Sequence, residues 1–248
     1  MGWTYNFIYQ RGSQMEHRKI HRLFTGKVKK AGHSDAGNKM DQAWESGIFK
    51  EPTEGPVYLT KTGFEGDEVA DKKNHGGPEK AVFVYPVRHY EEWKRELHAD
   101  IPVGGNGENF AVSGMDESNV CIGDTFKVGE AIVQVSQPRR PCWKPARRHK
   151  VIDLALRIQK TGGTGWYFRV LKEGHVQAGD TFERMEHPCP EWTIEACNEV
   201  MYNQTSNIGL AESLCACEYL ADNWKKTLNK RLQGREGSSE PRVFGPNR

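Results

Sequence analysis

Hydrophobic residues N-terminal to residue 187 recur mostly with the two-residue period of β-strands. Residues 131–136 alternate in this way and predict a strand that ends just before Gln137. Further strands are predicted at residues 23–28, 57–59, 81–85 and 164–170. Short strands joined by glycine-containing turns are typical of a β-barrel or a sandwich rather than of repeated βαβ units.

Helical periodicity is found at two main places. Residues 86–97 predict a helix that begins at Pro86 and carries Tyr90, Trp93 and Leu97 on one face. After a break at His187-Pro188-Cys189-Pro190, seven residues mark one amphipathic helix that ends near Gly234: Leu210, Leu214, Cys217, Leu220, Ala221, Trp224 and Leu228. Together with residues 193–202, this helix predicts a small helical domain.

These patterns predict a mainly β protein with added helices. An N-terminal extension (1–18) is followed by a β-rich domain (19–187), a helical domain (188–235) and a tail (236–248). The tail is rich in glycine, serine, proline and charged residues, so we expect it to be disordered.

Composition narrows the possible functions. The chain has 248 residues, with 35 Lys and Arg against 33 Asp and Glu, so its net charge of +2 argues against a general nucleic-acid binder. No apolar run approaches the roughly 18 residues that cross a bilayer, and the N-terminal residues lack the pattern of a signal peptide. We therefore expect a soluble cytoplasmic protein whose six cysteines are reduced.

Residues 137–144 carry the most distinctive chemistry. Pro138 and Pro141 stiffen a non-helical loop that presents Cys142 directly after the predicted strand. Between Glu130 and Asp153 there are six Lys or Arg residues and no carboxylate. Nearby positive charge favours the thiolate, which is a nucleophile or a soft metal ligand, and the same charges can hold a phosphate. The alternative is a buried structural cysteine beside a solvated basic surface.

Two glycine-rich segments are candidate ligand-binding loops. In His75-Gly76-Gly77-Pro78-Glu79-Lys80 the glycines let backbone N–H groups approach an anion, and Lys80 adds charge. In residues 104–110, Glu108 and Asn109 offer a carboxylate and an amide that suit the donor-rich edge of a heterocycle. The first segment is equally compatible with an ordinary turn, and for Glu108 and Asn109 the alternative is to cap a turn, which is the commoner role of Asn beside Gly. Arg169, in an aromatic strand, either reaches solvent or points at an anion.

The order of these motifs resembles that of the MOSC domain, and most closely its YiiM branch, the 6-N-hydroxylaminopurine resistance proteins. The similarity extends over roughly residues 20–235. It is carried by Gly66-Asp67, His75-Gly76-Gly77-Pro78 with Lys80, Tyr85-Pro86, Gly107-Glu108-Asn109, Gly123-Asp124, Gln137-Pro138-Arg139 and Pro141-Cys142. This resemblance implies a MOSC-type β-barrel followed by a three-helix C-terminal domain, and a detoxifying reductase of N-hydroxylated bases and related compounds that uses a molybdenum cofactor.

The resemblance also implies roles for particular residues. Cys142 would be the protein thiolate on molybdenum. The cofactor's phosphate and pterin would be bound by a set of motif residues: His75, Gly76, Gly77, Lys80, Glu108, Asn109, Gln137, Arg139 and Arg169. Arg140 and Trp143 depart from the residues often found in the branch, which bears on substrate preference.

The implied reaction needs two electrons from outside the chain. No Gly-x-Gly-x-x-Gly follows a predicted strand, and no iron–sulfur set of cysteines is present, so a separate flavin reductase is the expected electron donor. We expect no membrane association and no stable nucleic-acid binding, and a homodimer is possible. Two alternatives stay open at this point. One is a non-redox module that stores the cofactor or carries a persulfide on Cys142, and the other is a nucleic-acid binder that uses residues 139–150 and the C-terminal helices.

Overall fold

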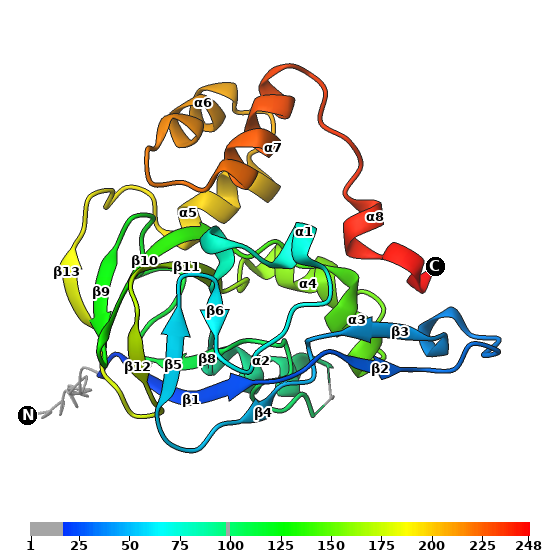
Figure 1. Ribbon diagram of the computed structural model, residues 1–248. Coiled ribbons are helices and arrows are strands. Elements are labelled where there is room, and N and C mark those ends of the chain that lie inside the picture. Colours follow the sequence, from blue (N-terminus) through cyan, green and yellow to red (C-terminus); the bar gives the residue numbers. More distant parts are fainter. Residues whose placement is uncertain (1–16, 98–99) are drawn as a thin grey trace, which may run out of the picture.

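A mixed sheet of eight strands forms the framework of the protein (Figure 1). The computed structural model describes residues 17–97 and 100–248, so most of the predicted N-terminal extension lies outside the described residues. In spatial order the strands are β13 (Glu183–Glu186), β9 (Thr125–Val128), β10 (Ala131–Pro138), β11 (Trp166–Lys172), β7 (Val82–Pro86), β8 (Phe110–Ser113), β1 (Lys19–Thr25) and β4 (Glu51–Pro52). All neighbouring pairs are antiparallel except β7 and β8.

The sheet curls until β1 meets the residues that lead into β13. The backbone N–H of Ile20 donates to Asp180 O at 2.9 Å, and that of Phe182 donates to Arg18 O at 2.9 Å. These bonds join opposite parts of the curled sheet, and aromatic and branched side chains fill its interior. The predicted barrel-like architecture is confirmed, although β1 begins and ends earlier than residues 23–28.

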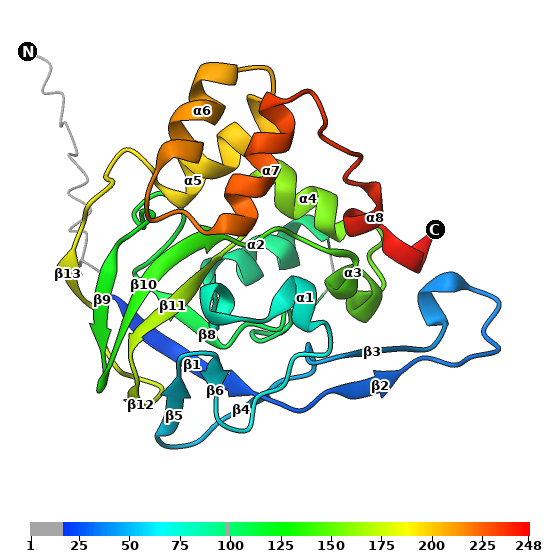
Figure 2. The same ribbon diagram turned by 45° about the horizontal axis from the view of Figure 1, so that its top comes forward.

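Two smaller sheets flank the barrel. One contains β12 (Gly174–Val176), β5 (Val57–Thr60) and β6 (Gly63–Phe64). The other is a hairpin of β2 (Lys29–Ala31) and β3 (Trp44–Ser46), with a short 3-10 helix (Lys39–Asp41) between its strands. Both views show this hairpin projecting from one side of the barrel, beyond α3 (Figures 1 and 2).

Three helices cover one face of the sheet: α2 (Arg88–Leu97), α3 (Trp143–His149) and α4 (Leu154–Thr161). The helix predicted after Pro86 is confirmed as α2, and Tyr90 and Trp93 are buried in a cluster that also holds Ile158 and Tyr167. A short α1 (Lys72–His75) and a 3-10 helix (Pro78–Lys80) lead into β7. None of the helices in the described part of the chain is long and apolar enough to cross a bilayer.

The C-terminal helical domain sits on top of the barrel (Figure 1). It comprises α5 (Ile194–Asn198), which continues as a π-helix (Glu199–Asn203), then α6 (Ile208–Ala216) and α7 (Asp222–Leu232). The single helix predicted between Leu210 and Leu228 is wrong, because the chain bends between α6 and α7 to meet the barrel. There the Ala221 N–H donates to Ser136 O of β10 at 2.9 Å, a contact that no local pattern encodes.

The tail is ordered, which corrects the expectation of disorder. Residues 240–247 form α8 (Glu240–Val243) and a 3-10 turn (Gly245–Asn247) that runs down beside α3 and α4 (Figure 2). Val243 and Phe244 are buried against Ala155 of α4. Arg147 of α3 donates from Nε to Asn247 Oδ1 at 2.7 Å and from Nη2 to Pro246 O at 3.1 Å. Two apolar side chains and these hydrogen bonds offset the flexibility expected from the tail's composition.

Candidate active site

Cys142 occupies the loop between β10 and α3, as the sequence predicted. Trp224 of α7 donates from Nε1 to Pro138 O at 3.0 Å, and the Arg139 N–H donates to Gly165 O at 3.0 Å, so both sides of the loop entry are fixed. Cys142 then takes the extended conformation of a residue that precedes a helix, with φ −128° and ψ 171°. The residue is 8% exposed and faces a cavity.

The surroundings of this thiol favour its ionised form. Burial by itself raises the pKa of Cys142, but the charge and hydrogen bond of His75, the charge of Arg139 and the backbone N–H of Lys144 together lower it to about 6. Other cysteines behave in the opposite way, since burial raises the pKa of Cys121 to about 11 and that of Cys189 to about 12. Cys142 is therefore set apart as the reactive sulfur.

The cavity has two compartments that meet at Cys142. Residues that line both include His75, Lys80, Lys144 and Tyr167. The first compartment is walled by the barrel and the loops before it, and it includes Lys50, Asp67, Phe83, Asn109 and Arg139. The second lies toward the helical domain and the tail, and it includes Gln137, Arg140, Trp143, Asn223 and Arg242.

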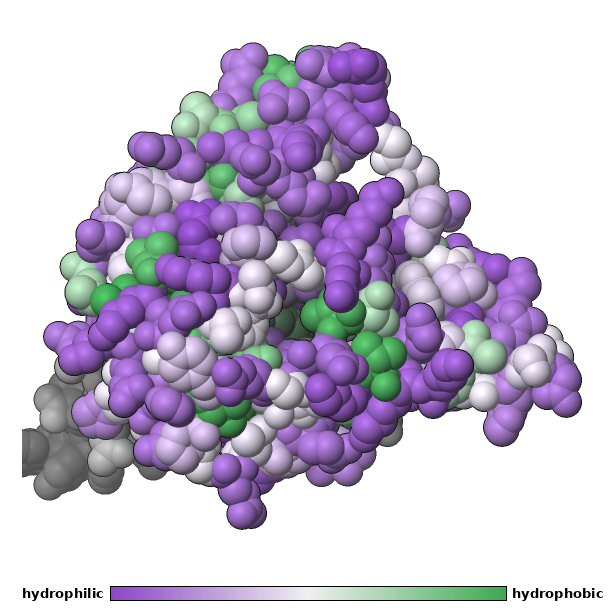
Figure 3. Space-filling model, viewed as in Figure 1, coloured by the Kyte–Doolittle hydropathy of each residue, from purple (hydrophilic) through white to green (hydrophobic). Residues whose placement is uncertain are grey.

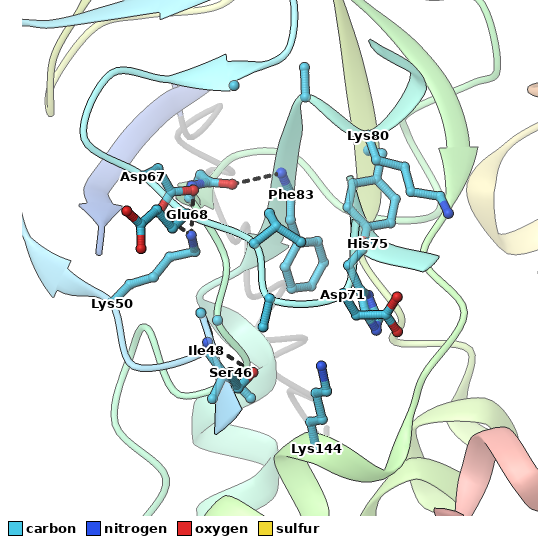
Figure 4. Close-up of a pocket in the computed structure, with 18 of the residues that line it drawn as sticks. Ser46, Ile48, Lys50, Asp67, Glu68, Asp71, His75, Lys80, Phe83 and Lys144 are labelled. Atoms are coloured by element: carbon cyan, nitrogen blue, oxygen red, sulfur yellow. Dashed lines mark hydrogen bonds and ion pairs between the residues drawn. The ribbon is translucent and has the colours of Figure 1, made fainter. Parts of the chain in front are cut away.

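Paired polar side chains form one side of the first compartment (Figure 4). Lys50 and Asp67 make a buried ion pair, and Asn109 Nδ2 donates to Asp67 Oδ2 at 2.9 Å. Asn109 Oδ1 accepts from the Phe83 N–H at 3.1 Å, which connects this group to β7. Burial lowers the pKa of Lys50 even though Asp67 acts to raise it. Asn109 thus helps to shape the compartment by orienting its neighbours.

The loop before β7 forms the other side (Figure 4). Asp71 caps α1 by accepting from the Asn74 N–H at 3.1 Å, and Lys80 Nζ donates to Asn74 O at 2.6 Å. Burial, followed by the charge of Arg140, lowers the pKa of Lys80. Gly77 has φ of 98°, a conformation that a side chain would strain. Gly76 and Gly77 line neither compartment, so they contribute backbone shape and hold His75 and Lys80 in place.

Two buried polar atoms beside the thiol have no partner in the protein. They are Arg139 Nη1 and Gln137 Oε1, on side chains that are 4% and 1% exposed. Arg139 also lies 4.8 Å from the ring centroid of Phe83. Buried donors and acceptors are normally satisfied, so these two atoms indicate a polar ligand or water in the cavity.

Arg169 and Glu108 do not line either compartment, which differs from the expected cofactor contacts. Arg169 uses its donors on Glu79 (Nη2 to Oε2, 2.5 Å), on Gln134 (2.8 Å) and on Tyr219 O (2.8 Å), and so links the barrel to the helical domain. Four of its five N–H donors are engaged within the protein, and its charge is paired with that of Glu79, so the side chain is committed to a structural role.

Glu108 is fully buried beneath the first compartment. It accepts from the Tyr90 hydroxyl at 2.5 Å and from the Gly104 N–H at 2.8 Å, and burial raises its pKa. Its carboxyl group shapes the glycine-rich loop, so the side chain next along the chain, Asn109, is the one at the cavity.

Lys50 and Arg242 line the cavity although the sequence analysis did not single them out. Lys50 precedes a proline-containing strand and carries no local motif. In the tail, the apolar pair Val243-Phe244 after Pro241 was the available signal that the segment docks. The residues that it packs against are distant in the sequence, so the tail alone does not predict them.

Comparison with known proteins agrees with this arrangement. Residues 71–183 match the model of the MOSC domain, and residues 192–235 match that of the YiiM-like 3-alpha helix domain. The chain is 36% identical over 204 residues to Protein YiiM of Escherichia coli, which covers 81% of this chain and 91% of the relative. The chain belongs to the YiiM branch of the MOSC-domain family. The tail (236–248) lies beyond both matched ranges.

Other members support the assignment to the YiiM branch. The uncharacterized protein YflK of Bacillus subtilis is 42% identical over 187 residues, with 75% of this chain and 85% of that protein covered. The crystal structure of YiiM from Geobacillus stearothermophilus has a TM-score of 0.72 at 31% identity, covering 87% of this chain and 99% of that one. A Gibberella moniliformis protein named Reductase is 38% identical over 169 residues, although the chain spans 30% of its length.

Proposed function

We propose that this protein is a molybdenum-cofactor-dependent reductase of N-hydroxylated bases and related N-hydroxylated compounds. The observation that carries the proposal is the sulfur of Cys142, whose pKa of about 6 makes it a thiolate at neutral pH at the junction of two cavity compartments. Membership of the MOSC family and a relative named Reductase support it.

The residues of the cavity fit such a cofactor. A thiolate is a soft ligand of the kind that suits molybdenum, and the unpartnered Arg139 Nη1 is a donor for an anionic cofactor group. Lys80 and Lys144 border the same point and add positive charge, and His75 adds an imidazole that can donate a hydrogen bond. When bound, the cofactor would supply the two-electron chemistry.

The chain's own residues would bind, orient and shield the reactants. Reduction of an N-hydroxylamine breaks its N–O bond and releases the hydroxyl group as water, which consumes two electrons and two protons. A separate flavin reductase would supply the electrons. Lys80 and Lys144 border both compartments, where their ammonium groups can stabilise negative charge that develops on the departing oxygen. Burial of the loop between β10 and α3 keeps bulk water from the thiolate.

Two measurements test the proposal. The first is the metal and pterin content of the purified protein, and the second is the rate at which it reduces 6-N-hydroxylaminopurine with a reduced viologen dye as electron source. We expect the wild type to hold molybdenum and pterin and to release adenine. Cys142→Ser should lose the reductase activity while its thermal stability changes little, and Cys215→Ser, at the end of α6, should keep both. Full activity of Cys142→Ser, or a protein made in a cofactor-producing host that holds neither metal nor pterin, contradicts the proposal.

The depressed pKa also suits a sulfur carrier, because thiolates form persulfides readily. Intact mass of the wild type and of Cys142→Ser separates the two functions. One additional sulfur on the wild type alone, without molybdenum, would favour the carrier.

A further inference from the structure

The second compartment is more basic than its neighbour and is built by three parts of the chain. Five of its lining residues are basic and two are acidic: His75, Lys80, Arg140, Lys144 and Arg242 against Glu45 and Asp71. Asn223 comes from α7 of the helical domain, and Arg242 comes from the tail. The compartment is therefore completed by residues outside the matched MOSC domain, which ends at 183.

Two arginines of this compartment keep an unused donor. Arg140 donates from Nη1 to Thr227 Oγ1 at 2.8 Å, while its buried Nε has no partner. Arg242 donates from Nη2 to Gln159 Oε1 at 2.6 Å and from Nη1 to Pro141 O, and its Nε is also buried without a partner. Both guanidinium groups are held in place by these hydrogen bonds, which use only some of the five N–H donors that each arginine carries.

The charges of these arginines are not neutralised by the protein. Across residues 17–97 and 100–248, no carboxylate forms an ion pair with Arg140, Arg242 or Arg139. Asp71 is held by Asn74, and Glu45 lies on β3. The buried hydroxyl of Tyr202, which does not line the compartment, lies within hydrogen-bonding reach of Arg140 and adds no charge that would neutralise it. Gln137, which lines the compartment, has a buried Oε1 without a partner on a side chain that is 1% exposed. Arginines that are paired with no carboxylate and keep free N–H donors are the arrangement in which proteins hold phosphate or carboxylate.

We propose that Arg140 and Arg242 bind the phosphate of the substrate, and that the preferred substrate is an N-hydroxylated nucleotide rather than the free base or nucleoside. This inference rests on the proposed function. The substrate is favoured over the cofactor as the source of the phosphate because Arg139, in the first compartment, keeps its own unpartnered donor for an anionic cofactor group. Through Arg242, the C-terminal tail would then help to select nucleotides over nucleosides and free bases.

Binding of reaction products to the cofactor-loaded protein provides a readout that is independent of turnover. Titration calorimetry should show adenosine 5′-monophosphate binding roughly tenfold or more tighter than adenosine. Arg140→Gln and Arg242→Gln should each remove most of that preference, and Arg242→Lys, which keeps a positive charge, should restore part of it. Arg157→Gln removes an exposed arginine on α4 and should leave it unchanged. Equal affinities for the two ligands in the wild type overturn the proposal.

Steady-state kinetics test whether the bound phosphate belongs to the substrate. With the wild type, N6-hydroxyadenosine 5′-monophosphate should have a lower KM than N6-hydroxyadenosine, while kcat should be similar for the two substrates. Arg242→Gln should raise KM for the nucleotide only. If instead both arginine variants lose pterin while the loaded fraction keeps its preference for the nucleotide, the pair binds the cofactor's phosphate, and the proposal is wrong.

Failure of the proposed function gives a different pattern. If the protein reduces neither compound and holds no molybdenum, but still binds adenosine 5′-monophosphate preferentially through Arg140 and Arg242, the phosphate site is supported and the reductase function is wrong. If the protein reduces the nucleoside and the nucleotide with equal KM, the reductase function is supported and the phosphate site is wrong.

Discussion

The side chain of His75 lies beside the sulfur of Cys142, although 66 residues separate them in the chain. Burial raises the pKa of the thiol, and the charge and hydrogen bond of His75 are the largest influences that bring it down to about 6. His75 comes from α1, whose position is set by the Asp71 cap and by the glycines that follow it. Figure 3 shows that most of the surface in this view is hydrophilic.

Replacing His75 should make Cys142 less acidic. In His75→Gln the electrostatic influence of the imidazole on the thiol is lost while the burial remains, so the pKa of Cys142 should rise by at least about one unit. The rate at which iodoacetamide alkylates the peptide that contains Cys142, measured as a function of pH by mass spectrometry, reports this pKa directly.

The same digest contains an internal control. Burial raises the pKa of Cys121 to about 11, so its alkylation profile should be identical in the wild type and in His75→Gln. An unchanged midpoint for Cys142 would mean that Arg139 and the helix backbone account for its acidity without the imidazole.

Ionisation of Cys142 should also make the stability of the cofactor-free protein depend on pH. The folded pKa of about 6 is lower than the value of about 8.5 for a free thiol, so between these values the unfolded state holds one more proton than the native state. The stabilisation is complete above the unfolded pKa and is lost as pH falls through 8.5 toward 6. It amounts to roughly 3 kcal/mol at its largest.

Urea unfolding of the wild type and of Cys142→Ser across this pH range measures the effect. The difference in unfolding free energy should increase with pH in the wild type's favour and level off above about pH 9. Cys215→Ser serves as the matched control and should show a constant difference. A pH-independent difference for Cys142→Ser would place the pKa of the native thiol at its ordinary value.

The position of the cysteine could be predicted from sequence because the loop that presents it is defined by neighbouring residues. Pro138 and Pro141 restrict the loop, and the neighbouring bases are close in the chain, so composition alone indicates a stiff and positively charged site. The strand that delivers the loop also has a clear two-residue period. These features depend on residues within one turn or strand.

Other features of the site depend on contacts between distant segments. Arg169 is turned away from the cavity because Glu79 and Tyr219 bind it, and the break between α6 and α7 exists because the Ala221 N–H donates to Ser136 O of β10. Glu108 and Asn109 are neighbours in sequence, yet only the second lines the cavity, since Tyr90 holds the first beneath it. No local pattern distinguishes these outcomes.

The docked tail should contribute measurable stability. Phe244 is 6% exposed and packs in a small cluster with Val243 and Ala155, so Phe244→Ala should lower the unfolding free energy by about 2–4 kcal/mol. It should also speed alkylation of Cys142, because Arg242 would no longer hold the Pro141 carbonyl. Ile152→Ala removes a side chain that is 41% exposed and should cost under about 0.5 kcal/mol. Equal effects of the two substitutions would mean that the tail does not dock in solution.

The buried histidine His89 should respond to pH in the opposite direction from the thiol. His89 is 4% exposed, with Nε2 2.9 Å from Glu117 Oε2 and Nδ1 3.0 Å from Glu92 Oε2. Burial acts to lower its pKa, but the two carboxylates raise it above the ordinary value. Because the folded pKa is the higher one, this stabilisation is fully present below the unfolded pKa of about 6.5 and is lost as pH rises through the folded pKa.

Glu117→Gln should reverse this balance. The buried carboxylate disappears and the burial of His89 remains, so an NMR titration of the imidazole should show its pKa falling by at least about one unit. The stability lost by the variant should be greatest below pH 6.5 and should shrink as pH rises, since the protonated histidine interacts more strongly with the Glu117 carboxylate than the neutral one does. Glu92→Gln removes a partner that is 44% exposed and should shift the pKa less. If both variants titrate like the wild type, His89 is neutral in the native protein, and its contact with Glu117 is a hydrogen bond without a net charge.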